Sequence, residues 1–370
     1  MKILITGAHF TPAVALIEEL NKRDDVDTLY VGRSTTLEGD PTPSQESKVL
    51  PQMGVKFIPI ISGRLQRTFT LYTIPSLLKI PIGIIQAIFI ILSKKPDLIL
   101  SFGGYVGLPL VFVGWLFSIP IIVHEQTLVS GLANKISFLF ADRIALSFDG
   151  FHKLDGKQIV ITGNLIRDKV LHPNYSDLGD EYHKLFTIAK KEKLPVVLIM
   201  GGNQGSHTIN KTVEGCLDKL TKMACVVHIT GDNKFKDFER LEELQGHRYL
   251  VKKWIGDEYG AVLSRVDFVI SRAGINTLTE LAYLGKPALV IPIPYLYQDE
   301  QNKNAKYFEG LGLTKILPQA KLSKKTLIKN IKLILDQLDR LKEKAKKAKS
   351  VVTADAAKRL ALEALLLVNR

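Results

Sequence analysis

Short apolar segments rich in β-branched residues alternate along the chain with longer amphipathic stretches, such as 12–20 and 131–139. Strands that alternate with helices in this way are typical of a parallel sheet covered on both faces. The predicted strands lie at 2–7, 28–32, 56–61, 97–104, 120–126, 143–148 and 158–164, and, further along the chain, at 195–202, 225–231, 248–254, 266–274, 286–294 and 314–318.

The alternation is interrupted once, after Asn164, by a polar stretch with a Lys/Glu-rich helix, and it then resumes. At roughly 150 residues per domain, the 370 residues allow two domains. We therefore predict an α/β protein of two doubly wound, Rossmann-like domains, 1–163 and 164–342, that face each other across a cleft. A Lys-rich C-terminal helix at 343–370 is expected to pack back on the first domain.

Charge is unevenly distributed along the chain. The formal net charge is +13, and residues 321–370 are especially rich in lysine. Residues 47–96 carry basic but no acidic side chains and are strongly apolar. A basic balance suits nucleic acid, an anionic membrane surface or phosphorylated substrates, and the apolar character of 47–96 favours the membrane surface over nucleic acid.

The most apolar segment, 71–92, is about as long as a bilayer is thick. A lysine, two prolines and a glycine interrupt it, and the uninterrupted run is confined to 80–92. A run of that length suits a buried or interfacial helix better than a membrane span. We expect peripheral attachment, with Arg64, Arg67 and neighbouring lysines beside the apolar run.

Two glycine-containing loops directly follow strands of the first half. ITGAHFTPA places Gly7 and His9 between a strand and a helix, and SFGGYVGLP places Gly103 and Gly104 after another strand. Open α/β sheets bind ligands at the carboxyl ends of their strands, where these two loops lie. Glycine lets the backbone approach a ligand closely. His9 is either a catalytic imidazole or a loop histidine without a role, and each glycine loop is either a ligand site or a tight turn.

A third cluster, His124, Glu125 and Gln126, ends a further strand and suggests a pocket wall. His124 and Glu125 are rivals of His9 for the role of general base. The chain shows no serine triad, HExxH, Walker A or zinc spacing, and its two cysteines fit no metal or redox motif. We expect no metal and no cofactor, and a reducing, cytoplasmic compartment.

In the second half, MGGNQGSHTIN follows a strand and opens a helix at Ser206. Glycines at a helix start form a cradle for a diphosphate, and Arg167 can supply a bidentate phosphate contact. Glu280 is either a carboxylate for ribose hydroxyls or a solvated helix residue. Gln301 and Asn304 are candidates to contact a sugar.

These motifs follow one order over nearly the whole chain: TGAHFTPA, FGGYVGLP, HEQ with GLANK, TGNLIR, GGNQG, and SRAG with TLTELAYLGKPALVIPIP and QDEQNKNA. The order resembles the MurG family of glycosyltransferase family 28. These are the undecaprenyldiphospho-muramoylpentapeptide β-N-acetylglucosaminyltransferases, which convert lipid I to lipid II in peptidoglycan synthesis. The resemblance implies a GT-B fold, with the acceptor in the N-terminal half and UDP-GlcNAc in the C-terminal half.

The resemblance also implies a role for individual residues, with His9 as the general base. The acceptor-binding residues it implies are Thr6, Gly7, Gly103, Gly104, Tyr105, His124, Glu125 and Gln126. The donor-binding residues it implies are Arg167, Gln204, Ser206, Ile255, Glu280 and Gln301, with Ile255 reading uracil and Glu280 binding ribose.

The partners implied are UDP-GlcNAc, a polyprenyl-diphosphate-linked acceptor, an anionic membrane surface and the cell-wall machinery that serves cell division and cell shape. The expected location is the cytoplasmic face of the cell membrane, held peripherally through the region around 71–92 with Trp115 nearby. No nucleic-acid partner is expected. The expected reaction is an inverting transfer of GlcNAc to the muramoyl 4-hydroxyl, releasing UDP.

Several positions depart from the family pattern. The first loop has Ile5 and Ala8 where the family has glycines, Thr127 replaces an asparagine, and Glu300 replaces a histidine or glutamine. These differences leave open a related GT-B UDP-sugar enzyme with another lipid or glycan acceptor, or a sugar-nucleotide epimerase.

Overall fold

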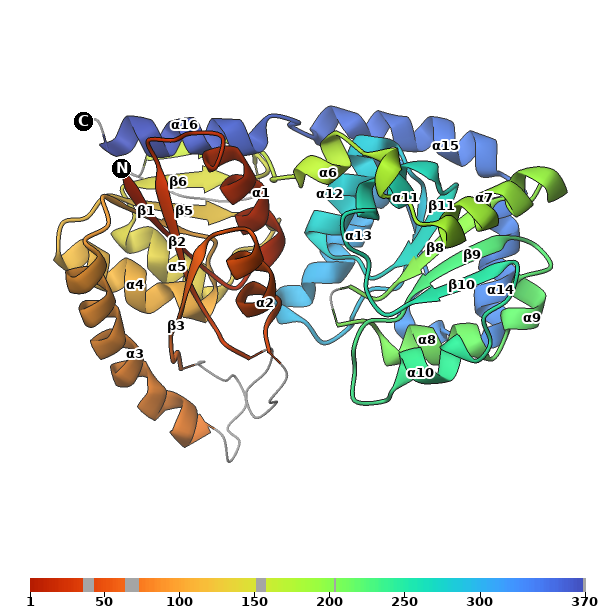
Figure 1. Cartoon of the computed structure of the whole chain (residues 1–370), viewed down its shortest axis with the longest axis horizontal. Coiled ribbons are helices and arrows are strands. Elements are labelled where there is room, and N and C mark those ends of the chain that lie inside the picture. The colour runs from red at the N-terminus through yellow and green to blue at the C-terminus, as the bar shows by residue number, and fades with distance from the viewer. Residues whose placement is uncertain (36–42, 64–72, 151–157, 203, 369–370) are drawn as a thin grey trace. The chain divides into compact units, whose positions relative to one another are not determined.

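The computed structural model describes residues 1–35, 43–63, 73–150, 158–202 and 204–368, with the side chains of 73–77 left out. The chain forms two compact units. The first comprises Met1–Arg167 together with Thr353–Arg370, and the second comprises Asp168–Val352. Figure 1 shows both units, with labels on the helices and strands where there is room.

The first unit is built on a seven-stranded sheet in which every neighbouring pair is parallel. Its strand order is β3-β2-β1-β4-β5-β6-β7, so the direction of winding reverses between β1 and β4. The strands are β1 (Lys2–Thr6), β2 (Asp27–Gly32), β3 (Lys56–Pro59), β4 (Leu98–Ser101), β5 (Ile121–Glu125), β6 (Arg143–Leu146) and β7 (Gln158–Ile161).

Alternating side chains of this sheet enter two separate cores. Ile3 and Ile5 of β1 pack with α1, α2 and α16, whereas Leu4 packs with α3, α4 and α5 on the other face. Apolar residues pointing both ways explain why the strands read as continuous apolar runs. The helices are α1 (Phe10–Leu20), α2 (Gln45–Gln52), α3 (Thr73–Lys94), α4 (Gly104–Leu116), α5 (Leu132–Phe140) and α16 (Ala356–Val368).

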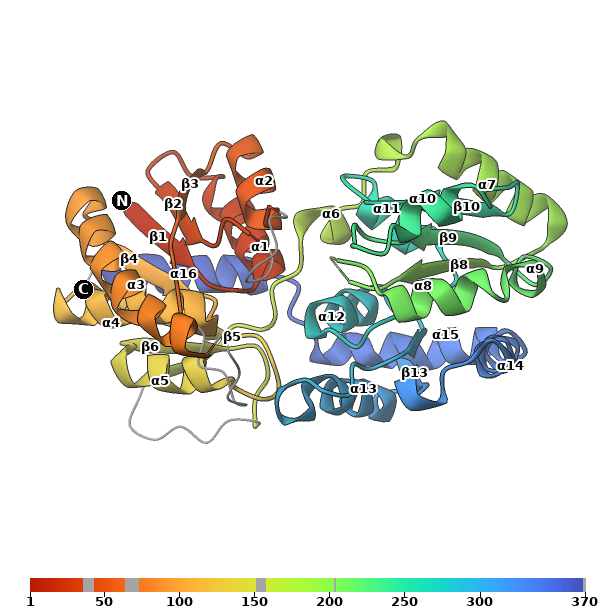
Figure 2. The same cartoon turned by 90° about the horizontal axis from the view of Figure 1, so that it is seen from below.

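The second unit has a six-stranded parallel sheet of order β10-β9-β8-β11-β12-β13, which reverses between β8 and β11. Figure 2 shows α8 and α14 among the helices that cover it, and both contribute to its core. The strands are β8 (Val196–Met200), β9 (Cys225–Ile229), β10 (Tyr249–Lys252), β11 (Phe268–Ser271), β12 (Ala288–Val290) and β13 (Thr314–Ile316). The α-helices are α6 (Asp168–Leu171), α7 (Asp180–Glu192), α8 (His207–Glu214), α9 (Leu217–Leu220), α10 (Asp237–Glu242), α11 (Tyr259–Arg265), α12 (Ile275–Leu284), α13 (Glu300–Gly310), α14 (Lys324–Leu335) and α15 (Leu338–Lys346), and the short 3-10 segments are η1 (Tyr175–Asp177), η2 (Tyr297–Asp299), η3 (Gln319–Lys321) and η4 (Lys347–Val351).

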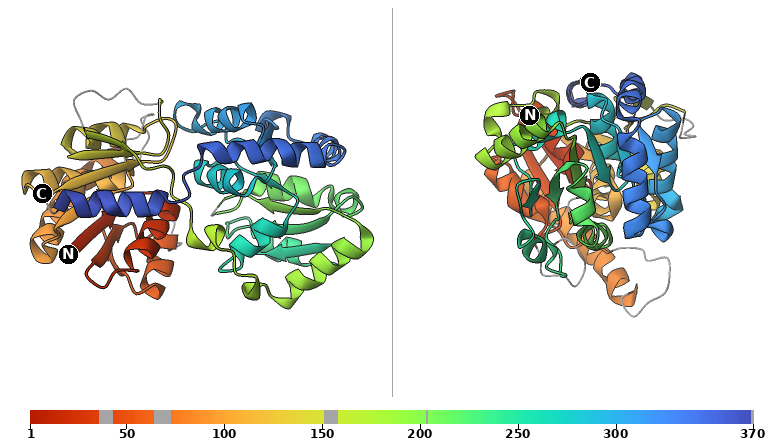
Figure 3. Two further views of the ribbon diagram at one scale, coloured as in Figure 1. Left: turned by 90° about the horizontal axis from the view of Figure 1, so that it is seen from above. Right: turned by 90° about the vertical axis from the view of Figure 1, so that its right-hand side faces the viewer.

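The unit boundaries differ from the predicted domain limits. The first unit continues through Arg167 because Leu165 is buried in its core. The predicted helix at 343–370 is not one element, since α15 and η4 stay with the second unit, where Ala345 and Ala348 are fully buried. Only α16 returns to the first unit, and Figure 3 shows it beside α1.

The apolar segment near residue 80 forms a single helix, α3, which is longer than the predicted run 80–92. Gly83 lets α3 approach the end of β3 closely, because a Cβ there would meet the Ile61 carbonyl oxygen at 2.5 Å. Among the described residues, no helix is long and apolar enough to cross a membrane. Arg64 and Arg67, predicted to flank the run, lie outside the described residues.

Candidate functional site

At the carboxyl edge of the first sheet, the loops after β1 and β4 press against each other. The Ala8 N–H donates to the Gly103 carbonyl at 2.9 Å. A Cβ on Gly7 would come within 2.8 Å of Phe102, and one on Gly104 within 2.6 Å of the Ala8 Cβ. Since all three glycines also have positive φ, larger residues are strained there. The backbone of this edge is therefore tightly held at the point where the winding reverses.

Two side-chain hydrogen bonds hold the loop that follows β1. The Tyr30 hydroxyl donates to the Gly7 carbonyl at 2.9 Å, and the fully buried Thr6 hydroxyl donates to Val31 O at 2.9 Å. Thr6, a predicted acceptor residue, thus ties β1 to β2.

His9 is the N-cap residue of α1, and its side chain makes no capping hydrogen bond. Burial, aided by the positive charge of Arg33, lowers the pKa of His9 to about 4. His9 nevertheless keeps part of its surface exposed to solvent. His9 is therefore a neutral imidazole at pH 7, able to accept a proton, at a loop that a ligand can reach.

The strand end at 124–126 is different, because all three of its polar side chains are buried. The Glu125 carboxylate accepts from the Thr127 N–H at 3.0 Å, from the Thr127 hydroxyl at 2.8 Å and from the Asn134 amide at 2.8 Å. Asn134 Oδ1 in turn accepts from the Gly104 N–H at 3.0 Å. Glu125 thus supports the second glycine loop through Asn134.

His124 is also fully buried, with Nε2 3.3 Å from the Gly163 carbonyl oxygen. Its burial lowers the pKa to about 4. Because His124 and Glu125 are enclosed and His9 is not, His9 is the better placed of the three predicted bases.

In the second unit, the glycine loop after β8 packs against the end of β9. Gly205 has φ +73°, and a Cβ there would lie 1.7 Å from the Thr230 carbonyl oxygen. The loop ends at Ser206, whose hydroxyl accepts from Arg272 Nη2 at 2.8 Å. Arg272 also donates from Nη1 to the Ile291 carbonyl at 2.8 Å. The buried guanidinium of Arg272 thus supports the loop that is predicted to bind a diphosphate.

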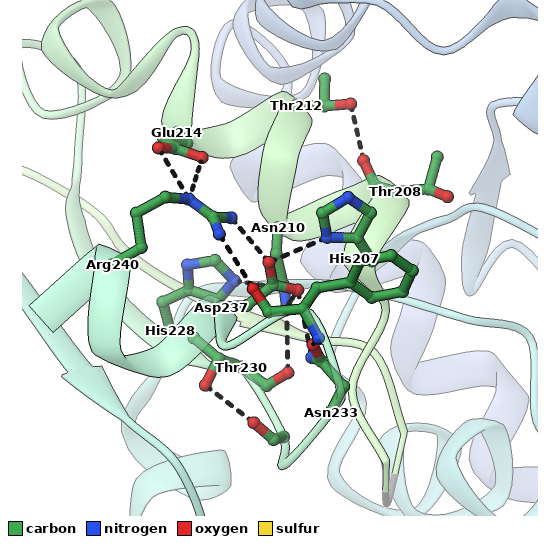
Figure 4. Close-up of polar contacts among 12 residues, drawn as sticks. His207, Thr208, Asn210, Thr212, Glu214, His228, Thr230, Asn233, Asp237 and Arg240 are labelled. Atoms are coloured by element: carbon green, nitrogen blue, oxygen red, sulfur yellow. Dashed lines mark hydrogen bonds and ion pairs between the residues drawn. The ribbon is translucent and has the colours of Figure 1, made fainter.

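A polar network braces the helix that follows this loop (Figure 4). The buried Asp237 carboxylate contacts His207 Nδ1 at 2.8 Å and accepts from the Asn210 amide at 2.9 Å and Arg240 Nη2 at 2.6 Å. Asn210 Nδ2 also lies 3.0 Å from Thr230 O, to which it donates. Burial alone would raise the pKa of Asp237, but these hydrogen bonds outweigh it and lower the pKa. The network fixes α8 directly behind Ser206.

Two further residues predicted to bind the donor, Glu280 and Gln301, lie on α12 and α13 of the second unit. Glu280 is buried rather than solvated, and its Oε2 accepts from the Tyr259 hydroxyl at 2.9 Å. Gln301 Oε1 accepts from the N–H groups of Ala273 and Ile293 at 3.3 and 3.0 Å. Both side chains are therefore held by their own unit.

The remaining predicted donor residues lie apart from these contacts. Gln204 is exposed within the glycine loop, and Ile255 is partly buried in the segment after β10. Arg167 closes the first unit instead of lying in the second, where the sequence had placed it. No group of three or more potential metal ligands is found among the residues that the structure describes.

Four residues that support these loops were not predicted as site residues: Asn134, Tyr259, Arg272 and Asp237. Asn134 and Arg272 lie inside motifs that the sequence analysis quoted, GLANK and SRAG, so a signal was present. Tyr259 and Asp237 lie in no motif. Their contacts with Glu280 and with α8 arise only from the fold.

Buried histidines give the protein a predictable response to acid. The pKa of His124 is lowered to about 4, and that of His228, whose ring accepts from the Tyr249 hydroxyl at 2.8 Å, is lowered by burial to about 3. The unfolded chain takes up protons near pH 6.5 while the folded chain does not, so the free energy of unfolding falls as the pH drops from 6.5 toward 4. At pH 4, each of these two rings accounts for a loss of roughly 3 kcal/mol from the free energy of unfolding.

Urea unfolding at pH 7.5, 6.0 and 4.8 measures this loss. His228→Gln should flatten the pH dependence, and His172→Gln, at an exposed position, should not. A free energy of unfolding that stays constant over this range in the unsubstituted protein would contradict the assignment.

The chain matches two family models. The glycosyltransferase family 28 N-terminal domain matches residues 6–146, and the glycosyltransferase family 28 C-terminal domain matches residues 196–360. Each match falls on one of the two sheets.

Curated relatives match along nearly the full length. The chain is 33% identical over 352 residues to a UDP-N-acetylglucosamine--N-acetylmuramyl-(pentapeptide) pyrophosphoryl-undecaprenol N-acetylglucosamine transferase of Bacillus cereus, covering 94% of this chain and 95% of the relative. It is 31% identical to the enzyme of that name from Legionella pneumophila, covering 93% and 90%.

Solved structures share the fold. MurG of Acinetobacter baumannii superposes with a TM-score of 0.70 at 22% identity, covering 99% of each chain. A UDP-GlcNAc 2-epimerase from Neisseria meningitidis superposes at 0.62 and 16% identity, covering 99% of this chain and all of the other. The GT-B fold is therefore common to transferases and epimerases, and sequence similarity separates them. The sequence similarity to the curated transferases, together with the glycine loops at the carboxyl edges of both sheets, shows that the chain belongs to the MurG family of glycosyltransferase family 28.

Proposed function

We propose that this protein transfers GlcNAc from UDP-GlcNAc to the muramoyl 4-hydroxyl of a polyprenyl-diphosphate-linked peptidoglycan precursor, giving lipid II and UDP. The observation that carries the proposal is His9, a neutral and partly exposed imidazole at the switch point of the first sheet. The similarity to relatives with this named activity supports it.

In the proposed reaction, the acceptor oxygen attacks C1 of GlcNAc while the bond from C1 to the β-phosphate oxygen breaks. The acceptor proton passes to an imidazole nitrogen of His9, and UDP leaves with the electron pair of the broken bond. Attack from the face opposite UDP inverts the configuration at C1. A neutral imidazole is suited to this role because a protonated ring has no lone pair to offer.

The donor's negative charge increases as UDP leaves, so the second unit must stabilise an anion. The first N–H groups of α8 and the Ser206 hydroxyl are the groups assigned to the diphosphate. Arg272 donates to Ser206 and so fixes this hydroxyl. Glu280 is assigned to the ribose hydroxyls, Ile255 to uracil, and Gln204 and Gln301 to the diphosphate and sugar, with Arg167 as a further diphosphate contact.

On the acceptor side, the backbone at Gly7, Gly103 and Gly104 and the side chain of Tyr105 are assigned to the lipid-linked substrate. Glu125 supports the second of these loops through Asn134, and we assign the buried His124 and Gln126 to the wall of the acceptor site. No metal or cofactor is required for this assignment, because the neutralising groups named above belong to the chain itself.

The outer face of α3, α4 and α5 is assigned to the membrane surface. α3 presents a stripe of exposed apolar side chains at helical spacing, while its other side is buried in the core. The exposed residues are Leu78, Ile82, Ile85, Phe89 and Leu92 on α3, Trp115, Leu116 and Phe117 at the end of α4, and Leu132 and Leu139 on α5. Exposed apolar patches of this kind mark interaction sites, and Lys79, Lys94 and Lys95 add attraction to anionic lipid, about 1 kcal/mol each.

Vesicle binding tests this surface. The pair Ile85→Glu with Phe89→Glu should weaken binding to anionic vesicles by about tenfold or more, because an apolar side chain contributes roughly 1.5–3 kcal/mol on burial. Leu366→Glu, an equally exposed change on α16, is the matched control. Salt should weaken vesicle binding by the unsubstituted protein, the pair variant and the control alike. Equal binding by the pair variant and the control would refute the assignment of this surface to the membrane.

The activity itself is tested by UDP release. Purified protein with UDP-GlcNAc should release UDP only when the lipid-linked acceptor is present. Release without acceptor, together with a 2-epimerised sugar, would favour the epimerase, whose fold is shared but whose reaction uses no lipid. An alternative acceptor would appear as transfer to another lipid or glycan.

A further inference from the structure

Three adjacent strands of the first sheet end in side chains of complementary chemistry. β1 is followed by His9, β2 by Arg33 and β4 by Tyr105, and these strands are neighbours in the order β2-β1-β4. Arg33 is not in any of the motifs that point to the MurG family, and no role follows for it from them. It lies at the edge where open α/β sheets bind ligands.

Arg33 is held in place by the side chain of Tyr105. Its Nη1 donates to the Tyr105 hydroxyl at 2.7 Å, and its guanidinium carbon lies 5.5 Å from the centre of the Tyr105 ring. Tyr105 stands in the first turn of α4, whose backbone is fixed by the contact of Gly104 with Ala8. The guanidinium is therefore anchored to the same rigid edge that carries His9.

The charge of Arg33 is not balanced by an acid within the described part of the chain. No carboxylate among the described residues forms an ion pair with it, and its Nε is buried without a hydrogen-bond partner. Its charge reaches His9, whose pKa it helps to lower. An anchored and partly buried guanidinium with unused donors is the group that proteins use to bind phosphate in a bidentate manner.

We propose that Arg33, oriented by Tyr105, binds the diphosphate of the lipid-linked acceptor and makes the enzyme select diphosphate acceptors over uncharged ones. The inference rests on the proposed function. It also accounts for the first loop, where Ile5 and Ala8 stand in place of family glycines: a side-chain cation supplies anion contacts that a glycine-rich backbone supplies elsewhere. A phosphate held here would lie beside His9, and so near the hydroxyl that His9 deprotonates.

Calorimetric binding of two acceptors tests the proposal without requiring turnover. One is the muramoyl-pentapeptide acceptor linked to a short prenyl chain through a diphosphate, and the other carries the same sugar and chain through an uncharged ether linkage. Arg33→Ala should weaken binding of the diphosphate acceptor by about 10- to 100-fold, as expected for a charge-assisted contact. Binding of the ether-linked acceptor and of UDP-GlcNAc should change by less than about twofold, within the error of such comparisons.

Two further variants keep the test decisive if Arg33→Ala is poorly folded. Arg33→Lys retains the charge but not the planar fork and should lose part of the selectivity. Tyr105→Phe removes the hydroxyl that orients Arg33 and should also lose part of it. Arg23→Ala, an exposed arginine paired with Asp25 in the same unit, is the matched control and should leave both affinities unchanged.

Equal weakening of both acceptors in Arg33→Ala, or no weakening of either, would overturn the proposal. These outcomes are distinct from failure of the proposed function, because that is judged on transfer by the unsubstituted protein. A protein that transfers GlcNAc but binds both acceptors equally well retains the function and loses the role of Arg33.

Discussion

His9→Ala is expected to lower kcat by about 10²–10⁴-fold, the range typical of a lost general base, and to leave the KM for UDP-GlcNAc near that of the unsubstituted protein. The reason is that His9 belongs to the first unit, whereas the residues assigned to the donor, Arg167 excepted, belong to the second. Steady-state kinetics with donor and acceptor varied separately measures both effects.

The pH profile adds a second check on His9. Because burial and Arg33 lower the pKa of His9 to about 4, the base stays unprotonated at mild acid pH, and kcat should not titrate near 6.5. His9→Gln keeps a hydrogen-bonding side chain without a basic nitrogen. If His9→Ala and His9→Gln both raise the acceptor KM while kcat stays intact, His9 only binds the acceptor and the base lies elsewhere.

Glu280→Ala is expected to lower kcat/KM for UDP-GlcNAc by roughly 10²-fold or more. A carboxylate that accepts from two ribose hydroxyls makes two charge-assisted hydrogen bonds, each worth about 1.5–3 kcal/mol. Since Glu280 is buried on α12 and fixed by Tyr259, the carboxylate is already oriented for them. The loss should fall on the donor and leave acceptor binding unchanged.

Tyr259→Phe is the control for Glu280. It removes the hydroxyl that orients the carboxylate but leaves the carboxylate itself, so its effect on the donor should be several-fold smaller. If kcat and KM of Glu280→Ala match those of the unsubstituted protein, the ribose assignment is lost. If Tyr259→Phe is as damaging as Glu280→Ala, the role of Glu280 is structural.

The two-sheet architecture was accessible from the sequence because its strands are marked locally. Each predicted strand overlaps an observed one, from 2–7, which holds β1, to 314–318, which holds β13. Buried parallel strands are apolar on both faces, so neither strand order nor partner is needed to find them. Glycine and polar residues then mark the ends of the strands, where ligands bind.

The contacts behind the loops were not accessible in this way. Arg272 reaches Ser206, which lies 66 residues away in the chain, and the pair meets only because β8 and β11 are neighbours in the sheet. Predicting it requires the strand order, which hydrophobic periodicity does not contain. The return of the chain at Thr353 was likewise misplaced, because the helices on either side of it are both amphipathic and the sequence alone does not show which core each one covers.

The most direct test of the account is the structure of the product formed from UDP-GlcNAc and the diphosphate-linked muramoyl-pentapeptide acceptor. Mass spectrometry should show the acceptor enlarged by one N-acetylhexosamine residue, with one UDP released for each. The anomeric proton of the new sugar should show the coupling of a β-linkage to the muramoyl 4-hydroxyl. An unmodified acceptor accompanied by 2-epimerised sugar, or a product with the sugar α-linked, would contradict an inverting GlcNAc transfer to this lipid.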